Sequence, residues 1–372
     1  MKILHVGKYQ FEKRGGIETL TYQLCKKLIK SKYDVSVLCS SEGRDTAEET
    51  YDGIPCVRAA TWLVVGSAPI CPFQLWYFLR NRKTFDLLHV HLPNPFATFF
   101  LLLAGTRAKI VVHWHSDIIK QKYLFKLYRP FLNAFLKRAD KIIATTPNYF
   151  EASGILQKFR EKVTVITMGL DEPKRASSES VEKWRSSFGG KKIVLSIGRL
   201  IYYKSYDVLV KAAALLPEDY HVVIIGSGEE KDSLAELAET AAAGRVTILS
   251  EIDDEDKNAL LEACDVFVLP SSYRSEAFGL VQVEAMQFSK PLVCCDIPGS
   301  GVSYVNKDGV SGIVTPVGDY AAMAEAVTKI CEDRDIYKVY SEGSYARYLE
   351  LFRSDTMLER TEILYKEVMK SE

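Results

Sequence analysis

The sequence lacks several features that would place the protein in a class at once. Its 372 residues balance 48 Lys and Arg against 48 Asp and Glu, so no net charge favours a nucleic-acid partner. The longest apolar runs, at 61–70 and 96–104, are shorter than the ~20 residues that a membrane-spanning helix needs. Eight cysteines occur without a C-x-x-C pair, which is typical of buried thiols in a reducing compartment. These absences argue against a nucleic-acid partner and against a transmembrane protein.

A signal peptide is missing too, because Met1-Lys-Ile-Leu-His-Val opens directly as a strand. We therefore expect a cytoplasmic protein, or one that lies on a membrane from that side. The length of the chain predicts two domains, each large enough for a core of its own. Residues 171–187 are polar and Ser-rich and mark the linker, so the domains are expected at 1–172 and 173–349.

Short apolar, β-branched runs alternate with helical patterns along both halves, which is typical of an α/β fold with parallel sheets. The strands expected in the first half are 3–7, 35–38, 54–58, 87–90, 109–113, 141–144 and 163–166. Those expected in the second half are 192–198, 222–226, 246–250, 264–269 and 291–296. Two such halves of similar size predict a cleft between facing sheets.

The stretch from Pro270 to Met286 carries the most chemistry. A buried strand ends at Pro270 and a helical pattern begins near Leu280, with Glu276 at the junction and Glu284 about two turns later. The first amides of such a helix attract an anion, and a carboxylate beside an anion is best used on hydroxyls, so the ligand implied has both phosphates and sugars. The alternative is that Glu276 only caps the helix and Glu284 is solvated. The amides expected to face the anion are those of Ala277, Phe278, Gly279 and Leu280.

Two basic residues follow the first strand of the second half. Arg199 and Lys204 stand between that strand and a helix predicted at 208–216. Arg offers a planar fork and Lys a point charge, and both suit a diphosphate. Glycines at a strand end, or as a pair before a helix, let a ligand approach the backbone, although no G-x-G-x-x-G fingerprint is formed. The glycines in question are Gly15, Gly16, Gly198, Gly226 and Gly228.

The spacing Glu276-x7-Glu284, after a strand that ends Leu-Pro-Ser, resembles the retaining nucleotide-sugar glycosyltransferases of family 4, which have the GT-B fold. The resemblance runs through most of the chain. It implies an α/β protein of two Rossmann-like, doubly wound parallel-sheet domains that face each other across a cleft, with the acceptor on the first and the donor on the second. It also implies a hairpin at 309–314, and a C-terminal helix at about 350–372 that packs back on the first domain.

By this resemblance Arg199 and Lys204 match the phosphate clamp Gly-Arg-x4-Lys-Gly, in which both side chains neutralise the leaving nucleotide; Ser205 replaces its last glycine. Glu276 orients the sugar and Glu284 the ribose. The donor-binding residues implied are Gly15, Gly16, Gly198, Arg199, Lys204, Gly226, Gly228, Glu251, Ile252, Glu276, Ala277, Phe278, Gly279, Leu280 and Glu284.

The resemblance also gives the histidines a place. His115 matches the family's histidine near the reaction centre, where it is expected to contact the transferred sugar; otherwise it is a strand-end histidine bonded to a carbonyl. His91 and Asp117 are expected on the acceptor side. His89 and His91 alternate on one strand, but no third metal ligand is evident. The acids at 253–256 suit the start of a helix better than a metal, so no metal and no other cofactor is expected. The catalytic set implied is His115, Glu276, Arg199 and Lys204.

The segment 120–138 mixes basic and aromatic residues along apparent helices, which suits an anionic membrane surface. We therefore expect peripheral contact with the cytoplasmic face of the inner membrane. The alternative is an ordinary amphipathic helix that packs four apolar residues inward. These residues are Leu124, Leu127, Phe131 and Phe135.

The partners implied are a nucleotide-diphosphate sugar and a glycan or lipid-linked glycan acceptor. The run 114–122 resembles bacterial mannosyltransferases of O-antigen and capsule assembly. Glu251 suits the two adjacent N–H donors of guanine, so GDP-mannose is favoured over a UDP-hexose. Two alternatives stay open: a nucleotide-sugar epimerase of the same fold, and a non-catalytic nucleotide-sugar-binding module without turnover.

Overall fold

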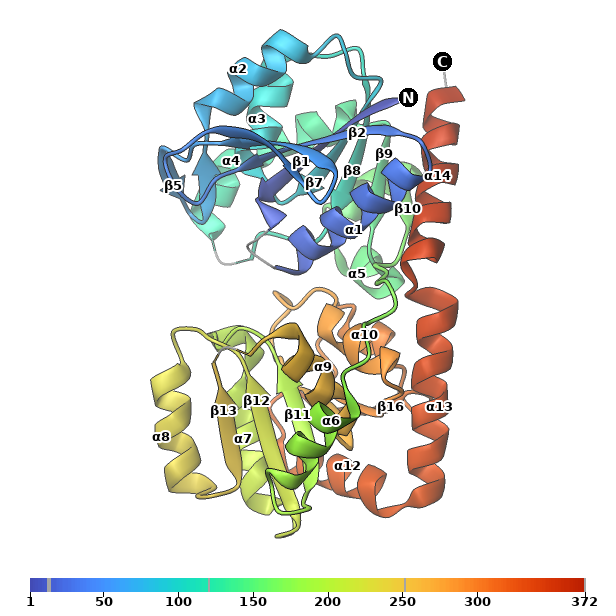
Figure 1. The fold of residues 1–372 in the computed structure, drawn as a ribbon. Coiled ribbons are helices and arrows are strands. Elements are labelled where there is room, and N and C mark those ends of the chain that lie inside the picture. The colour runs from blue at the N-terminus through green and yellow to red at the C-terminus, as the bar shows by residue number, and fades with distance from the viewer. Residues whose placement is uncertain (12–14, 120, 251, 371–372) are drawn as a thin grey trace. The chain divides into compact units, whose positions relative to one another are not determined.

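The structure, a computed structural model, describes residues 1–11, 15–119, 121–250 and 252–370. The chain forms two compact units, shown in Figure 1. The first unit consists of Met1–Asp171 together with Ser354–Glu372, and the second consists of Glu172–Arg353.

Parallel pairing dominates the first unit. Its strands are β1 (Lys2–Tyr9), β2 (Asp34–Ser40), β3 (Ala47–Tyr51), β4 (Ile54–Ala59), β5 (Leu63–Val65), β6 (Ala68–Ile70), β7 (Leu87–Leu92), β8 (Lys109–Trp114), β9 (Lys141–Ala144) and β10 (Val163–Val165). The described strands of its large sheet follow the order β10-β9-β8-β7-β1-β2-β4-β3, with β3 antiparallel at the edge. Strands β5 and β6 form a separate hairpin. β1 and β7 are buried because layers of helix cover both faces, as parallel sheets require.

The helices of the first unit are α1 (Gly16–Lys30), α2 (Pro72–Asn81), α3 (Pro95–Ala104), α4 (Lys122–Arg138), α5 (Pro147–Ala152), the 3-10 helix η2 (Leu156–Lys162) and α14 (Ser354–Lys370). α14 is the last helix of the chain, yet it lies beside α1 (Figure 1). Lys27 of α1 forms an ion pair with Asp355 of α14, and the Ser354 amide donates to the Leu170 carbonyl. The C-terminus therefore completes the unit that the N-terminus begins.

The second unit contains one described parallel sheet, in the order β13-β12-β11-β14-β15-β16. Its strands are β11 (Lys192–Ile197), β12 (Tyr220–Ile225), β13 (Val246–Leu249), β14 (Val266–Leu269), β15 (Leu292–Cys295) and β16 (Gly312–Thr315). Its helices are α6 (Ser178–Ser186), η3 (Tyr202–Lys204), α7 (Tyr206–Leu215), α8 (Lys231–Ala241), α9 (Asp254–Ala263), α10 (Leu280–Gln287), α11 (Val302–Val305), α12 (Tyr320–Glu332) and α13 (Arg334–Leu351). The hairpin expected at 309–314 is wrong: β16 is a single strand that pairs in parallel with β15, after a turn in which the Gly309 amide donates to Gly312.

Each sheet has a switch point, which is the place at which the direction of winding reverses. In the first unit the chain leaves β1 for β2 on one side and later builds β7, β8, β9 and β10 on the other. In the second unit the same reversal falls between β11 and β14. Because open parallel sheets bind ligands outside the carboxyl ends of strands at such a point, these two places are where a site is expected.

The surface of the first unit exposes apolar side chains along α4. Leu124, Leu127 and Phe131 expose 46%, 74% and 46% of their area, whereas Phe135 is buried. The interpretation of 120–138 as a helix that packs all four of these residues inward is therefore wrong for three of them. No helix in the described part of the chain combines the length and hydrophobicity that crossing a membrane requires.

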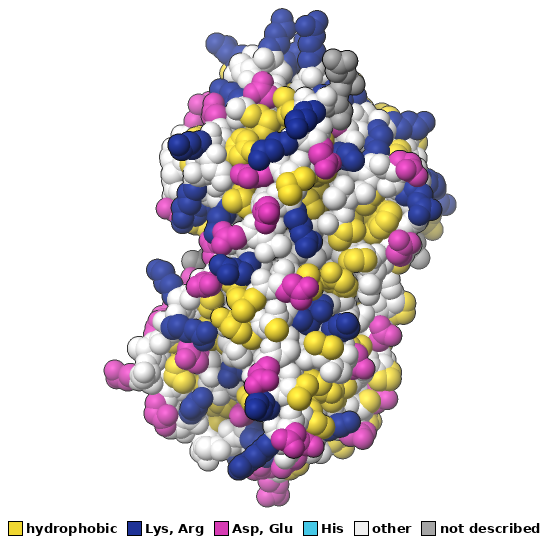
Figure 2. Space-filling model, turned by 90° about the vertical axis from the view of Figure 1, so that its right-hand side faces the viewer, with side chains coloured by type: hydrophobic (Ala, Val, Ile, Leu, Met, Phe, Trp, Pro, Cys, Tyr) yellow, Lys and Arg dark blue, Asp and Glu magenta, His cyan; other side chains and the backbone are white. Residues whose placement is uncertain are grey.

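Charges of both signs are interspersed on the face drawn in Figure 2, and no histidine among the described residues is visible there. All six histidines of the sequence are in fact buried. Burial of so many imidazoles is unusual, because each ring carries two nitrogens that need hydrogen-bond partners.

Candidate active site

The switch point of the second unit holds a nearly buried ion pair. Lys204 Nζ lies 2.6 Å from Glu276 Oε2, and the two side chains expose only 10% and 12% of their area. Ser271 Oγ also donates to Glu276 Oε2, at 3.2 Å. Burial lowers the pKa of Lys204, but Glu276 and neighbouring tyrosines outweigh it and raise the pKa to about 12. The site therefore carries a fixed ammonium beside a carboxylate.

Local backbone geometry explains how this pair is built. η3 ends at Lys204, and Ser205 then adopts the left-handed region (φ 51°, ψ 45°) before α7 begins. The turn of the expected phosphate clamp is thus kept with serine in the place of glycine. At the end of β11, a Cβ on Gly198 would lie 3.2 Å from Lys204 Nζ, so a larger residue would crowd the ammonium.

The helix α10 starts where the sequence predicts, but the amides expected in its first turn mostly precede it. The helix begins at Leu280 with Gly279 as its N-cap, at φ 77°, and no side chain caps it. Glu276 is therefore not a helix cap, and that interpretation is wrong. Ala277 and Phe278 are buried residues that precede the helix, so of the four amides expected in its first turn only that of Leu280 lies there. The left-handed φ of Gly279 shortens the helix, since glycine adopts it freely.

The other expected donor-binding residues have partners of their own. Arg199 is exposed and donates to the Tyr203 hydroxyl at 3.2 Å. Glu284 is not merely solvated, because its Oε2 lies 3.1 Å from Lys257 Nζ on α9. Ile252 is partly exposed, whereas Glu251 lies outside the described residues.

Two of the glycines have a packing reason for their place. A Cβ on Gly226 would clash with the carbonyl oxygen of Gly198, and one on Gly228 would clash with that of Leu200. These backbones lie close because the Gly198 and Leu200 amides donate to Ile225 and Ser227. Gly226 and Gly228 are thus required by the fold even without a nucleotide. The acids at 253–256 start α9 as expected, since the Asp253 side chain accepts from the Asp256 amide.

In the first unit Gly15 is the N-cap of α1 and Gly16 its first residue. A Cβ on Gly15 would clash with the Glu18 carboxylate. Asp117 is held at one oxygen by Trp114 Nε1, at 3.0 Å, and by Ser153 Oγ, at 2.9 Å. The carboxylate of Asp117 thereby ties the end of β8 to the residue that follows α5.

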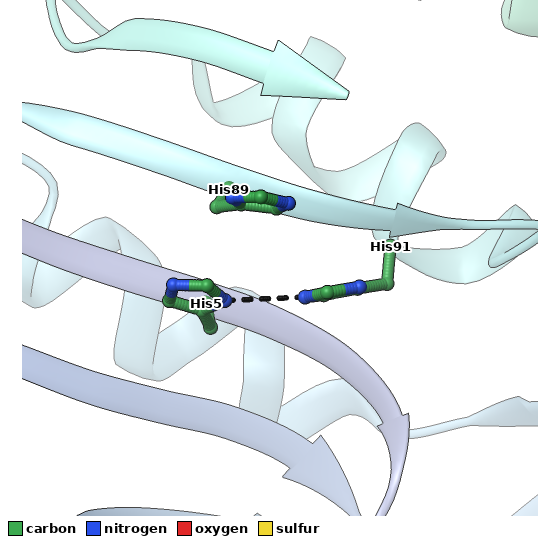
Figure 3. A group of neighbouring side chains, drawn as sticks. All are labelled: His5, His89 and His91. Carbon is green, nitrogen blue, oxygen red and sulfur yellow. Dashed lines mark hydrogen bonds between the residues drawn. The ribbon is translucent and has the colours of Figure 1, made fainter. Parts of the chain in front are cut away.

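The switch point of the first unit is built from histidines instead of charges. His91 and His115 are joined through their ring nitrogens at 3.0 Å, and His5 joins His91 at 3.1 Å. Figure 3 shows the second of these bonds, with the His89 ring facing it. His113 meets His89 at 3.2 Å. The reason given against a metal, that no third ligand exists, is wrong: two groups of three histidines lie within reach of one another. These groups are His5, His89 and His91, and His91, His113 and His115.

Burial keeps these rings uncharged. It lowers the pKa of His5 and of His113 to about 3, with a further contribution to His5 from His113. Burial and the neighbouring imidazoles also hold the pKa of His89, His91 and His115 well below the ordinary value. At neutral pH the cluster therefore has no charge with which to attract a phosphate.

The structure thus brings together Gly198, Lys204 and Glu276 in the second unit, and His91 with His115 in the first. Sequence reasoning missed Ser271 and the two further histidines, His5 and His113. The pairing of β1 with β7 would have revealed His5, because it places His5 in register with His89. Likewise, the register of β7 with β8 would have revealed His113, because it aligns His113 with His91.

The sequence is similar to those of known glycosyltransferases along the whole chain. Residues 14–173 match the family described as Glycosyltransferase Family 4, and residues 179–347 match Glycosyl transferases group 1. The chain is 34% identical to O-antigen chain mannosyltransferase C of Escherichia coli, over all of both chains. It is 36% identical to the D-rhamnosyltransferase WbpZ of Pseudomonas aeruginosa, over 95% of this chain and 92% of that protein.

Solved structures confirm the fold. Sucrose-phosphate synthase from Thermosynechococcus elongatus superposes with a TM-score of 0.81 at 19% identity, over all of both chains. Anabaena HepE in complex with UDP gives a TM-score of 0.78 at 21% identity, over 99% of this chain and all of that one. The two Rossmann-like α/β units are those of the GT-B fold. With a bacterial relative matched along its whole length, the chain belongs to glycosyltransferase family 4 and is a hexosyltransferase that uses a nucleotide sugar.

Proposed function

We propose that the protein transfers mannose from GDP-mannose to a glycan or lipid-linked glycan in surface-polysaccharide synthesis, with retention of anomeric configuration. The full-length similarity to an O-antigen mannosyltransferase supports the sugar and the pathway class. HepE binds UDP and UDP-glucose, but its 21% identity supports only the fold. A UDP-hexose therefore stays the second candidate.

The observation that carries the proposal is the Lys204–Glu276 pair at the switch point of the second unit. A diphosphate brings negative charge to Lys204 and to the exposed Arg199, and stabilising the departing diphosphate is the kind of electrostatic term that dominates catalysis. A sugar hydroxyl donates to Glu276 without adding charge. In this assignment Glu284 takes the ribose and His115 the transferred sugar, with Asp117 toward the acceptor.

Calorimetry with GDP and UDP tests the donor. We expect GDP to bind more tightly, because guanine offers two adjacent N–H donors to one carboxylate, for which Glu251 is proposed. Tighter binding of UDP would end the mannosyl assignment. Incubation with GDP-mannose alone then separates the alternatives, since an epimerised sugar would indicate an epimerase and binding without turnover on any acceptor would indicate a binding module.

The two basic residues also predict that turnover needs no divalent ion, because Arg199 and Lys204 take the place of a metal at the diphosphate. Activity in the presence of EDTA should equal that in magnesium or manganese. Complete loss in EDTA, restored by either metal, would contradict this role.

We further propose that α4 contacts an anionic membrane from the cytoplasmic side, where a lipid-linked acceptor is presented. Leu124, Leu127 and Phe131 supply the exposed apolar surface and Lys126 and Arg129 the exposed positive charge. The variant Lys126→Glu/Arg129→Glu should release the protein from vesicles that contain phosphatidylglycerol. The matched control, Lys338→Glu/Lys366→Glu, reverses two exposed charges on α13 and α14 and should leave binding unchanged. Equal sedimentation of both variants would refute the contact.

A further inference from the structure

The buried histidines form two rows of hydrogen-bonded rings. The first row is His5, His91 and His115, whose neighbouring nitrogens are 3.1 Å and 3.0 Å apart. The second row is Tyr365, His89 and His113, joined through the Tyr365 hydroxyl and a 3.2 Å bond. Strands β1, β7 and β8 supply the histidine rings and α14 supplies Tyr365, while Thr21 of α1 contacts His91 at 3.4 Å. One face of the sheet thus buries a polar layer where a core would be apolar.

Ring geometry separates hydrogen bonding from stacking. The planes of His91 and His115 differ by 11° and their centroids are 5.3 Å apart, so these rings meet edge to edge through the 3.0 Å bond. The planes of His113 and His115 differ by 12°, but the centroids are only 4.4 Å apart, so these rings lie face to face. The first row therefore lies on the second, and His115 is bonded to His91 but only stacked on His113.

A row of neutral imidazoles allows only two proton arrangements. Each neutral ring has one N–H donor and one acceptor nitrogen. His91 uses both of its nitrogens within the row, Nε2 with His5 and Nδ1 with His115. All three protons must then point toward His115 or all must point toward His5. The tautomer of His115 is consequently coupled to that of His5, two strands away.

The ends of the row favour one arrangement. Among the described residues, neither His5 Nε2 nor His115 Nδ1 has a hydrogen-bond partner, and both atoms are buried. Protons that point toward His5 would leave an N–H donor stranded at the inner end of the row. Protons that point toward His115 put the N–H donor instead on His115 Nδ1, at the outer end of the row and just past the carboxyl end of β8, where an oxygen of a bound ligand can accept it.

A second unsatisfied group stands beside the outer end. The register of β8 with β9 pairs Trp114 with Ala144, so the next residues, His115 and Thr145, are neighbours on the same face. Thr145 Oγ1 is likewise buried without a partner in the described part of the chain. Two unsatisfied polar atoms at the carboxyl end of adjacent strands are suited to an oxygen of a bound ligand.

We propose that His5 and His91 are positioning residues, which hold His115 in the tautomer with its proton on Nδ1 and so make it a hydrogen-bond donor to a hydroxyl oxygen of the transferred sugar, next to Thr145. The sugar as ligand rests on the function proposed above. A transition metal in the same cluster is the competing use. Both three-histidine groups include His91, so a metal there would break the row by taking a nitrogen that is already bonded.

Nuclear magnetic resonance of the full chain, labelled at histidine and free of substrate, tests the tautomer directly. The loss of a signal in His115→Asn assigns the ring. We expect one His115 tautomer, protonated at Nδ1, in the wild type and in His113→Phe. In His91→Phe, and in His5→Phe as the milder variant, we expect a mixture. The Phe substitutions form a matched set, because each replaces a buried ring, but only those in the first row interrupt it.

Turnover gives the second readout. Because one hydrogen bond to the transition state is lost, His91→Phe should lower kcat about tenfold, while His113→Phe should change it by less than about threefold. His115→Asn should keep more turnover than His115→Gln, since the asparagine amide nitrogen takes the place of Nδ1. Inactivity of every protein with GDP-mannose would count against the proposed donor, and the resonance experiment would still decide the tautomer.

Three results would overturn the proposal. These are a His115 ring protonated at Nε2 in the wild type, equal effects of His91→Phe and His113→Phe on the tautomer, and stoichiometric zinc that is retained on dialysis and lost in His91→Phe.

Discussion

The two switch points solve the burial of polar groups in opposite ways. In the second unit the side chains of Lys204 and Glu276 form an ion pair at 2.6 Å, and both are nearly buried. In the first unit five imidazoles are buried and uncharged, and they bond to one another. The same topological position thus holds strong charge in one sheet and none in the other.

This difference divides the work that the proposed reaction requires. Charge is useful where a diphosphate must be held and released, and the second unit supplies it at Lys204 and Arg199. Neutral donors and acceptors are useful where only hydroxyls are handled, and the first unit supplies them at His115 and Thr145. It follows that the first unit should respond to acid and the second to the loss of one ion-pair partner.

Acid should produce the largest loss of stability. The folded pKa of the five clustered histidines lies below that of the unfolded chain, about 6.5, and it is about 3 for His5 and His113. The unfolded state therefore binds more protons below pH 6.5, and stability falls as the pH falls from there toward 3. Each group contributes about 1.4 kcal/mol per pH unit.

Urea denaturation at pH 7, 6 and 5 measures this loss. His113→Phe should remove one proton from the slope. A midpoint that stays constant between pH 7 and 5 would show that the cluster is not neutral in the fold.

Removal of one partner of the ion pair should produce the second largest loss of stability. Lys204→Met leaves the Glu276 carboxylate nearly buried and unpaired, which should cost about 3–5 kcal/mol of stability. Arg199→Met is the matched control, because Arg199 is exposed and should change stability by less than about 0.5 kcal/mol. The double variant Lys204→Met/Glu276→Leu should regain most of the loss. No difference between the two single variants would mean that the pair is solvated.

The smallest change in stability is expected at the turn that follows Lys204. Ser205 adopts a left-handed φ of 51°, which costs a residue with a Cβ about 1–2 kcal/mol. Ser205→Gly should therefore raise stability by about 1 kcal/mol, since part of the gain is offset by the greater freedom of glycine when unfolded. A lower midpoint for Ser205→Gly would mean that the serine side chain stabilises the turn more than its backbone strains it.

Most of the fold could be predicted, because the central strands are short runs of apolar, β-branched residues between turns. Strands β3, β5 and β6 were missed, the first two for a physical reason. The sequence of β3, Ala-Glu-Glu-Thr-Tyr, is an edge strand without an apolar face, and β5 exposes all three of its residues. Neither carries the periodicity that burial imposes on a strand.

The candidate site was predictable in its residue types but not in its pairings. Glu276 and Lys204 stood out in the sequence as ligands for a donor, yet their bond joins residues 72 apart and depends on the register of β11 with β14. His5 lies 86 residues before His91, so its place in the row follows only from the pairing of β1 with β7. The start of α10 at Leu280 was predicted, but the amides before it were wrongly placed in its first turn, because Gly279 turns to a positive φ.

The central claim is that the second unit holds the donor, with Glu276 at the sugar and Glu284 at the ribose. The affinity for GDP and the turnover of GDP-mannose, measured for Glu276→Gln and Glu284→Gln, test it most directly. Glu284→Gln should weaken GDP binding by about 1.5–3 kcal/mol, the value of a charged hydrogen bond. Glu276→Gln should leave GDP binding within about twofold, because Lys204 keeps its charge for the diphosphate, and should lower kcat by a comparable free energy. Equal losses of GDP affinity in both variants would contradict the assignment.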